Sequence, residues 1–147
     1  MDTIALRFGE HFAPECGTIV SHQKIIDDLG YVWYGKMGAK VSETLLKKII
    51  ASKTPRILLV NSGKTDRYWA YIDAYSFEQP SIGDFPNYYG EKKESMKSWF
   101  RIIKFEVAPK DIMSKCHVIS SGATLGEVSK HSMSPYFKIR YNDEEVL

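Results

Sequence analysis

The feature that most constrains the fold of this chain is the early position of its helical segments. Amphipathic patterns with start or stop signals cover residues 18–29 and 42–50, both before Pro55. Strand-like patterns cover residues 3–8, 31–35, 56–61, 67–77, 99–107 and 135–141. A parallel βαβ array needs crossover helices, which the second half lacks. We therefore expect an α+β fold, in which two early helices pack on a small, curled, mixed β-sheet or barrel.

Local signals mark where several elements begin and end. Thr18 can cap the first helix, Gly30 can end it, and Ser42 can cap the second helix. Thr124 can cap one short helical turn, with a glutamate at the spacing of a capping box. Residues 78–95 contain two prolines and two glycines without a clear period, so we expect a long loop there. Long ordered loops are often functional.

Size and composition fit one domain. The 147 residues are 44% hydrophobic and 26% charged, which predicts a single domain with a core over residues 1–147. The net charge of +2 is too small for a nonspecific DNA-coating protein, so any contact with a polyanion must be local. The acidic tail at residues 143–145 is expected to fray.

Cysteine usage favours a reducing compartment. Cys16 and Cys116 lie far apart and have no Cys or His partner at metal-finger spacing. We therefore expect no disulfide, metal or cofactor. The chain has no basic N-terminal segment before an apolar run, and no window approaches the length of a membrane span. These patterns predict a soluble cytoplasmic protein with no membrane partner.

Motifs typical of catalysis are missing from the sequence. Residues 61–65 read Asn-Ser-Gly-Lys-Thr, like the end of a Walker loop, but the upstream glycine is missing and the segment joins two strands. Cys116 and His117 could act as nucleophile and base, yet adjacent strand residues point to opposite faces. We therefore expect that the protein is not an enzyme. The alternatives are a small nucleotide- or nucleic-acid-processing enzyme that uses Cys116, His117 or His131, and a peptide-binding interaction module.

Aromatic side chains gather in two segments that could line a pocket. Residues 30–35 read Gly-Tyr-Val-Trp-Tyr-Gly and form a short strand between glycines. Trp33 either packs in the core or faces a ligand, and the two interpretations carry similar weight. Tyr88 and Tyr89 lie in a polar loop, where a purely structural role is less natural. Planar partners for such rings include nucleic-acid bases.

The densest basic stretch follows this aromatic loop and includes two neighbouring glutamates, Glu91 and Glu94. Its cations are Lys92, Lys93, Lys97, Arg101 and Lys104. A solvated face is the more common role for such a stretch, but the nearby tyrosines favour contacts to phosphates. If these residues are only a solvated face, the phosphates would contact the region of Lys36, Lys40 and Lys47 instead.

In the order of its elements, the chain resembles the YTH and EVE branch of the PUA-like superfamily, whose members recognise modified bases in nucleic acid. The resemblance extends from the first strand to about Gly122. The matching segments are residues 4–8, 30–33, 45–50, 57–60, 62–64, 68–75 and 99–105.

The resemblance implies an aromatic cage around a base. In that family, the tryptophan corresponding to Trp33 forms one wall, and the loop before a late strand supplies another. The implied cage residues are Trp33, Tyr34, Tyr88 and Tyr89. Polar residues at the end of the first strand bind the base edge in the family, and the residues at this place are Arg7, Phe8 and Gly9. This set departs from the family's pattern.

The resemblance also implies a role in the cell. Similar domains read DNA in prokaryotic modification-dependent restriction systems of the McrB type. The chain would then be a non-catalytic reader that binds a methylated base flipped out of its duplex. The resemblance favours DNA over RNA as the ligand. It also implies an AAA+ motor or nuclease on the same or another chain.

Overall fold

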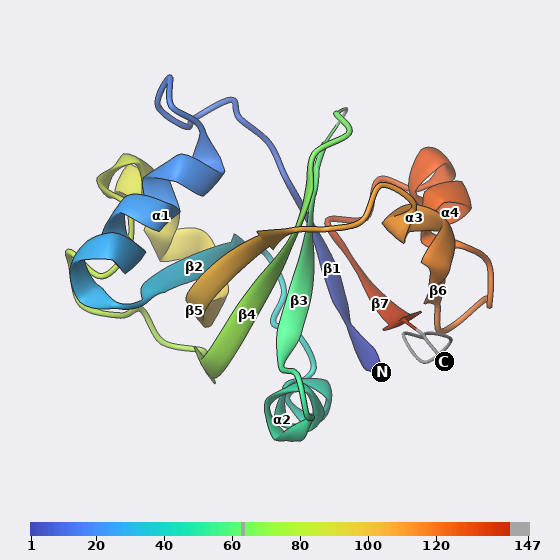
Figure 1. The fold of residues 1–147 in the computed structure, drawn as a ribbon. Helices are drawn as coiled ribbons and strands as arrows, with labels where there is room; N and C mark the ends of the chain where they lie inside the picture. Colours follow the sequence, from blue (N-terminus) through green and yellow to red (C-terminus); the bar gives the residue numbers. More distant parts are fainter. Residues whose placement is uncertain (63, 142–147) are drawn as a thin grey trace.

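In the part of the chain that the structure describes, the strands form one mixed β-sheet with helices packed around it (Figure 1). A computed structural model describes residues 1–62 and 64–141. The strands are β1 (Asp2–Phe8), β2 (Val32–Met37), β3 (Arg56–Asn61), β4 (Arg67–Ser76), β5 (Met96–Val107), β6 (Cys116–Val118) and β7 (Tyr136–Tyr141). Their order in the seven-stranded sheet is β2-β5-β4-β3-β1-β7-β6. Only β1 and β3 pair in parallel among these strands. The expected α+β fold with a mixed sheet is confirmed.

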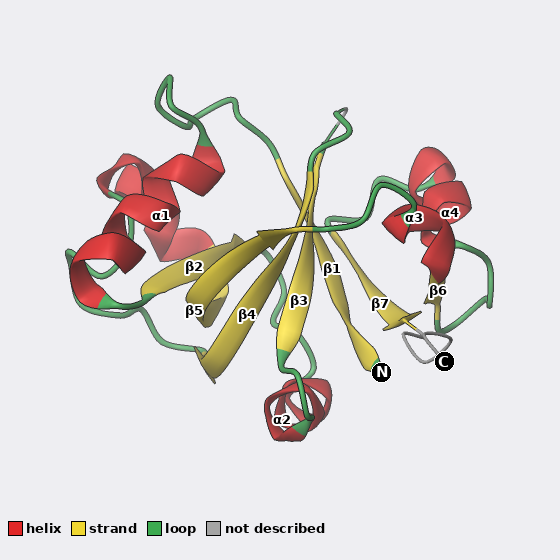
Figure 2. Ribbon diagram, in the orientation of Figure 1, coloured by secondary structure: helices red, strands yellow, loops and turns green. Residues whose placement is uncertain are grey.

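Helices lie at three places around this sheet. They are α1 (Thr18–Leu29), α2 (Glu43–Ala51), the 3-10 helix η1 (Asn87–Ser95), α3 (Ile112–Lys115) and α4 (Leu125–His131). Figure 2 shows α1 beside β2 and β5, α2 below the strands, and α3 and α4 beside β6 and β7. The two early helices therefore pack on the sheet as expected.

Three of the four predicted helix boundaries are confirmed. Ser42 and Thr124 accept hydrogen bonds from backbone N–H groups of the first turns of α2 and α4, and Gly30 ends α1 at a positive φ of 88°. The cap of α1 was predicted wrongly. Thr18 is already helical, and its N–H and hydroxyl both donate to Oε1 of Glu10, at 2.9 and 2.5 Å. A carboxylate from the preceding loop thus satisfies the helix start.

Other differences concern weakly patterned segments. Residues 78–95, expected as a loop, contain η1, which is kinked at Gly90 with φ 54° and ψ −135°. The short elements α3 and β6 were not predicted, because four and three residues are too few to show a period. The tail at residues 143–145 lies outside the described residues.

The strongly aliphatic strand β3 is buried on both faces of the sheet. Ile57 and Leu59 belong to a core cluster with Leu46 of α2, whereas Leu58 and Val60 belong to a second cluster with residues of α3 and α4. Coverage on both faces explains why β3 reads as a nearly continuous apolar run instead of an alternating one.

The sheet curls, so that the edge strand β2 approaches β1 and β7, near the opposite edge. Nζ of Lys36, on the edge strand β2, lies 4.7 Å from the ring centroid of Tyr136, at the start of β7. Side chains of β1 and β2 line a common cavity, although β5, β4 and β3 separate these strands in the sheet. This gap between β1 and β2 holds the candidate site.

Candidate nucleic-acid interface

A cavity of about 250 Å³ opens between β1, β2, η1 and the segment before α1. Its aromatic lining residues are Phe8, Phe12, Tyr34, Tyr88 and Tyr89. Tyr34 and Tyr89 are buried, whereas Phe12 is 64% exposed. The volume lies just below the roughly 300–1,000 Å³ typical of pockets for drug-sized ligands. The cavity therefore suits a ligand the size of one base.

The charged side chains that line this cavity are all cations among the described residues: Arg7, Lys36 and Lys92. Lys36 is buried, and its Nζ donates to the carbonyl oxygens of Met37 and Ala39 at 3.1 and 2.9 Å. Burial lowers the pKa of Lys36. Aromatic walls combined with cations suit a planar ligand that is rich in hydrogen-bond acceptors.

Tyr89 is held in the wall by a directional chain of hydrogen bonds. The Thr18 carbonyl can only accept, so Nδ1 of His22, 2.7 Å away, donates to it. Burial lowers the pKa of His22 to about 4, so the ring is neutral at pH 7 and its Nε2 accepts from the Tyr89 hydroxyl at 2.6 Å. That hydroxyl accepts from the N–H of Gly35 at 3.2 Å. The chain joins α1, η1 and β2 at the cavity.

Behind Tyr89 lies a second layer of rings. Phe85 stacks on Tyr89 with centroids 5.6 Å apart and an interplanar angle of 19°, and Phe85 also packs on Trp99 at 5.2 Å. Trp33 packs against this cluster and is not among the residues that line the cavity. Tyr34, the next residue of β2, lines the cavity, because neighbouring strand residues point to opposite faces. The structure therefore brings together Tyr34, Tyr88 and Tyr89, but not Trp33.

A family model described as Pua-like matches residues 4–145 of the chain. The chain belongs to the Pua-like family. Pua-like domains are typically RNA- or DNA-binding modules, so membership supports nucleic-acid binding. No match to the chain was found among curated proteins or among solved structures.

All three predicted base-edge residues of this Pua-like domain line the cavity, namely Arg7, Phe8 and Gly9. The Arg7 guanidinium is largely occupied elsewhere. Its Nε donates to the Ser134 carbonyl at 2.9 Å, and its Nη2 donates to the carbonyls of Ser129 and Ser132 at 2.8 and 2.7 Å. These carbonyls lie at the end of α4 and just after it, where a cation is favoured. Arg7 thus ties β1 to this segment.

The predicted basic stretch of the Pua-like domain is dispersed in space. Lys92 lines the cavity, and its Nζ lies 3.5 Å from the Phe12 ring centroid. Nζ of Lys93 donates to the Gly90 carbonyl, and Arg101 forms a bidentate pair with Asp73 at 2.7 and 3.0 Å. Nζ of Lys104 lies 5.3 Å from the Tyr71 ring centroid, and Lys97 is exposed on β5. Of the five, the structure brings only Lys92 to the cavity.

Cys116, His117 and His131 are not arranged as a nucleophile with a base. Cys116 is buried, which raises the pKa of its thiol to about 12, while the neighbouring His117 is exposed. His131 is exposed on α4 with its Nε2 3.8 Å from Glu127. Over residues 1–62 and 64–141, no group of three or more His, Cys, Asp or Glu is placed to hold a metal ion. In the same part of the chain, no helix is both long and apolar enough to cross a membrane.

Sequence reasoning missed Phe12, which lines the cavity, and His22, which holds the lining residue Tyr89. A single histidine on an amphipathic helix gives no signal that separates it from an ordinary helix residue. The one usable sign is its spacing of four residues from Thr18, which permits the bond to the helix carbonyl.

Proposed function

We propose that this Pua-like domain is a non-catalytic reader that binds a single base of a nucleic acid in the aromatic cavity. The observation that carries the proposal is a base-sized cavity whose walls include Phe8, Tyr34 and Tyr88 and whose charged lining is cationic. Stacking of a base on an aromatic ring is worth about 1–3 kcal/mol and tolerates any base, because every base has a π-face. Specificity must then come from the base edge.

A modified, most simply methylated, base is the ligand we propose. The rings of the cavity can desolvate a methyl group that water would otherwise surround. Phe8 and Gly9, at the end of β1, line the cavity, and we propose that they contact the base edge. A cavity for one base also requires that base to leave its stack, as in enzymes that flip bases. The resemblance to modified-base readers agrees with both features.

We extend the proposal to the setting of the domain. A reader without catalysis needs another activity to act on what it finds, so we propose an AAA+ motor or nuclease on the same or another chain. The resemblance favours DNA and a cytoplasmic restriction or defence system. These finer statements depend on the base-reading activity itself.

A binding panel tests the proposal. The purified chain is titrated with oligonucleotides of one sequence that are unmodified, or carry a central N6-methyladenine or 5-methylcytosine, each as DNA and RNA and as single and double strands. We expect one modified form to bind at least tenfold more tightly than its unmodified counterpart. Equal affinity for all modified and unmodified forms would contradict a modified-base reader, and formation of a reaction product would indicate the enzyme alternative.

A further inference from the structure

A second cavity, of about 700 Å³, adjoins the aromatic one. The two share the wall formed by Arg7, Phe8, Gly9 and Pro135. Beyond this wall, the second cavity is lined by polar and charged residues, among them Asn61 and Ser62, together with Met133. The second cavity lacks the tyrosines of the aromatic cavity and has more charged and amide or hydroxyl residues in its lining.

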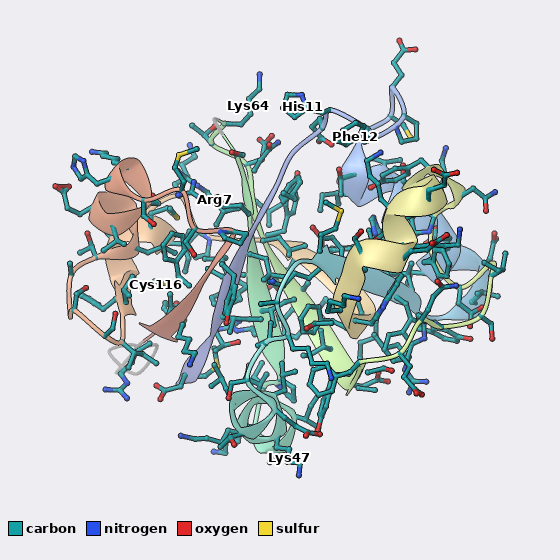
Figure 3. All side chains as sticks on the ribbon, turned by 180° about the vertical axis from the view of Figure 1, so that it is seen from behind. Arg7, His11, Phe12, Lys47, Lys64 and Cys116 are labelled. Carbon is teal, nitrogen blue, oxygen red and sulfur yellow. The ribbon has the colours of Figure 1, made fainter. Side chains whose placement is uncertain are left out.

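Two lysines from distant parts of the sequence line this second cavity. Lys64 comes from the turn between β3 and β4, and Lys130 comes from α4. Figure 3 shows Lys64 and His11 at one end of the molecule, Arg7 between that end and the middle, and Lys47 at the opposite end. Both lining lysines are exposed, and neither forms an ion pair with another described residue.

The acidic residue that lines the same cavity is already engaged. Oε1 of Glu10 accepts from both the N–H and the hydroxyl of Thr18 at the start of α1. Its charge is therefore directed to the helix N-terminus. Lys64 and Lys130 are left as cations in the lining of the second cavity, which favours an anionic ligand.

Resting on the proposed function, we infer that the ligand is a continuous nucleic-acid strand, whose backbone passes from the aromatic cavity over the shared wall into the second cavity. A flipped nucleotide stays bonded to its neighbours, so its flanking phosphate must lie beside the cavity that holds its base. Lys64 and Lys130 contact the phosphates of this flanking segment. A free nucleoside would fill the aromatic cavity alone.

The charge arrangement favours these lysines over the other cations nearby. The Arg7 guanidinium already donates to three carbonyls, and Arg101 is paired with Asp73. Lys92 lies on η1, an element that contributes no residue to the second cavity among those described. Phosphate contacts fix the register of a strand without reading its sequence, so this surface adds affinity equally for modified and plain strands.

The test compares the double variant Lys64→Ala and Lys130→Ala with a matched control, Lys47→Ala and Lys53→Ala, which removes the same charge. Lys47 and Lys53 are exposed and do not line either cavity. The probes are nine-nucleotide single strands with a central N6-methyladenine or 5-methylcytosine, and the two corresponding free deoxynucleosides. Affinities are measured from 50 to 300 mM NaCl. A Lys→Arg double variant at positions 64 and 130 checks that charge is what matters.

We expect the first variant to lower the slope of log affinity against log salt by about 1.4, at about 0.7 per lost contact to a single strand. Its affinity for the strand should fall by on the order of tenfold at 100 mM salt, while nucleoside affinity stays the same. The control and the arginine variant should match the wild type. A salt slope unchanged from the control would overturn the inference, as would equal wild-type affinity for strand and nucleoside. Failure of the wild type to bind any probe would instead overturn the proposed function.

Discussion

The Tyr89 hydroxyl donates a 2.6 Å hydrogen bond to Nε2 of His22, so a fully buried helix residue fixes a ring that lines the candidate cavity. The direction of this bond follows from the Thr18 carbonyl at the other side of the imidazole, which can only accept. Burial also raises the pKa of Tyr89 well above its ordinary value, so its hydroxyl keeps the proton that it donates. The cavity wall is therefore preorganised before any ligand binds.

Tyr89→Phe should destabilise the fold while keeping the ring. The change leaves Nε2 of His22 and the N–H of Gly35 without their partner in a buried place, which costs about 1–3 kcal/mol. Urea unfolding measures the free energy. Tyr75→Phe is the control, because its hydroxyl binds Glu43 at the surface, and it should change stability by less than about 0.5 kcal/mol. Equal effects of the two variants would show that the buried bond adds nothing.

Stability should fall as the pH is lowered from about 6.5 to about 4 through His22. The pKa of His22 is about 4 in the folded chain and 6.5 in the ordinary group. Between these two pH values, His22 is protonated in the unfolded chain and neutral in the folded chain. The stabilisation is complete above pH 6.5, and about 3 kcal/mol is lost by pH 4. Unfolding titrations at several pH values should show this loss in the wild type and in His131→Gln. In His22→Gln the loss should be absent, and its persistence there would assign the effect to other groups.

Gly35→Ala should be destabilising because the strand has no room for a methyl group. An added Cβ would overlap Sδ of Met96 and would lie 3.0 Å from Cζ3 of Trp99. Overpacking of this kind costs about 1–3 kcal/mol. Gly9→Ala is the control at the same cavity, since its Cβ would meet only the His11 ring, at 3.6 Å. Adding Met96→Ala to Gly35→Ala should recover part of the lost stability, as measured by thermal unfolding. No recovery would contradict the assigned clash.

Trp33→Ala should act mainly on stability. Trp33 packs against the ring cluster behind Tyr89, and truncation of a partly buried tryptophan there should cost about 2–3 kcal/mol. Affinity of the folded variant for a modified strand should change less than in Tyr88→Ala, because Tyr88 lines the cavity and Trp33 does not. Unfolding curves and titrations on both variants decide the order. If Trp33→Ala keeps its stability but loses binding, then Trp33 is a cage wall, as the family resemblance implies.

Sequence patterns predicted the elements that carry strong local signals. Ser42 and Gly30 act through bonds and dihedral angles within one turn, so their roles are readable from the sequence. The choice between Trp33 and Tyr34 was not readable, because both faces of β2 are covered by aromatic residues and a strand alternates between them. His22 lies 67 residues from Tyr89, and only the fold brings the two together.

The basic stretch at residues 92–104 shows that residues close in sequence can lie far apart in the fold. Its cations are close in sequence, but they lie on η1 and β5 and face different surfaces. Asp73 on the neighbouring strand β4 forms an ion pair with Arg101. Lys64 and Lys130 lie 66 positions apart and line one cavity. Closeness in sequence therefore identified only Lys92 of the five at the aromatic cavity, and only the fold brings Lys64 and Lys130 to one cavity.

The central claim is that a base stacks in the aromatic cavity, and titration of Tyr88→Ala with the tightest-binding modified oligonucleotide tests it most directly. Tyr88 is half-buried at the cavity and packs edge-on against Tyr89, with ring centroids 5.3 Å apart, so its truncation leaves the buried rings of Phe85, Tyr89 and Trp99 in the fold. We expect affinity to fall by about 5- to 150-fold, with a small change in melting temperature. Tyr71→Ala, which removes a half-buried ring outside the cavity, should bind like the wild type. Unaltered affinity of Tyr88→Ala together with a large drop in melting temperature would contradict the account.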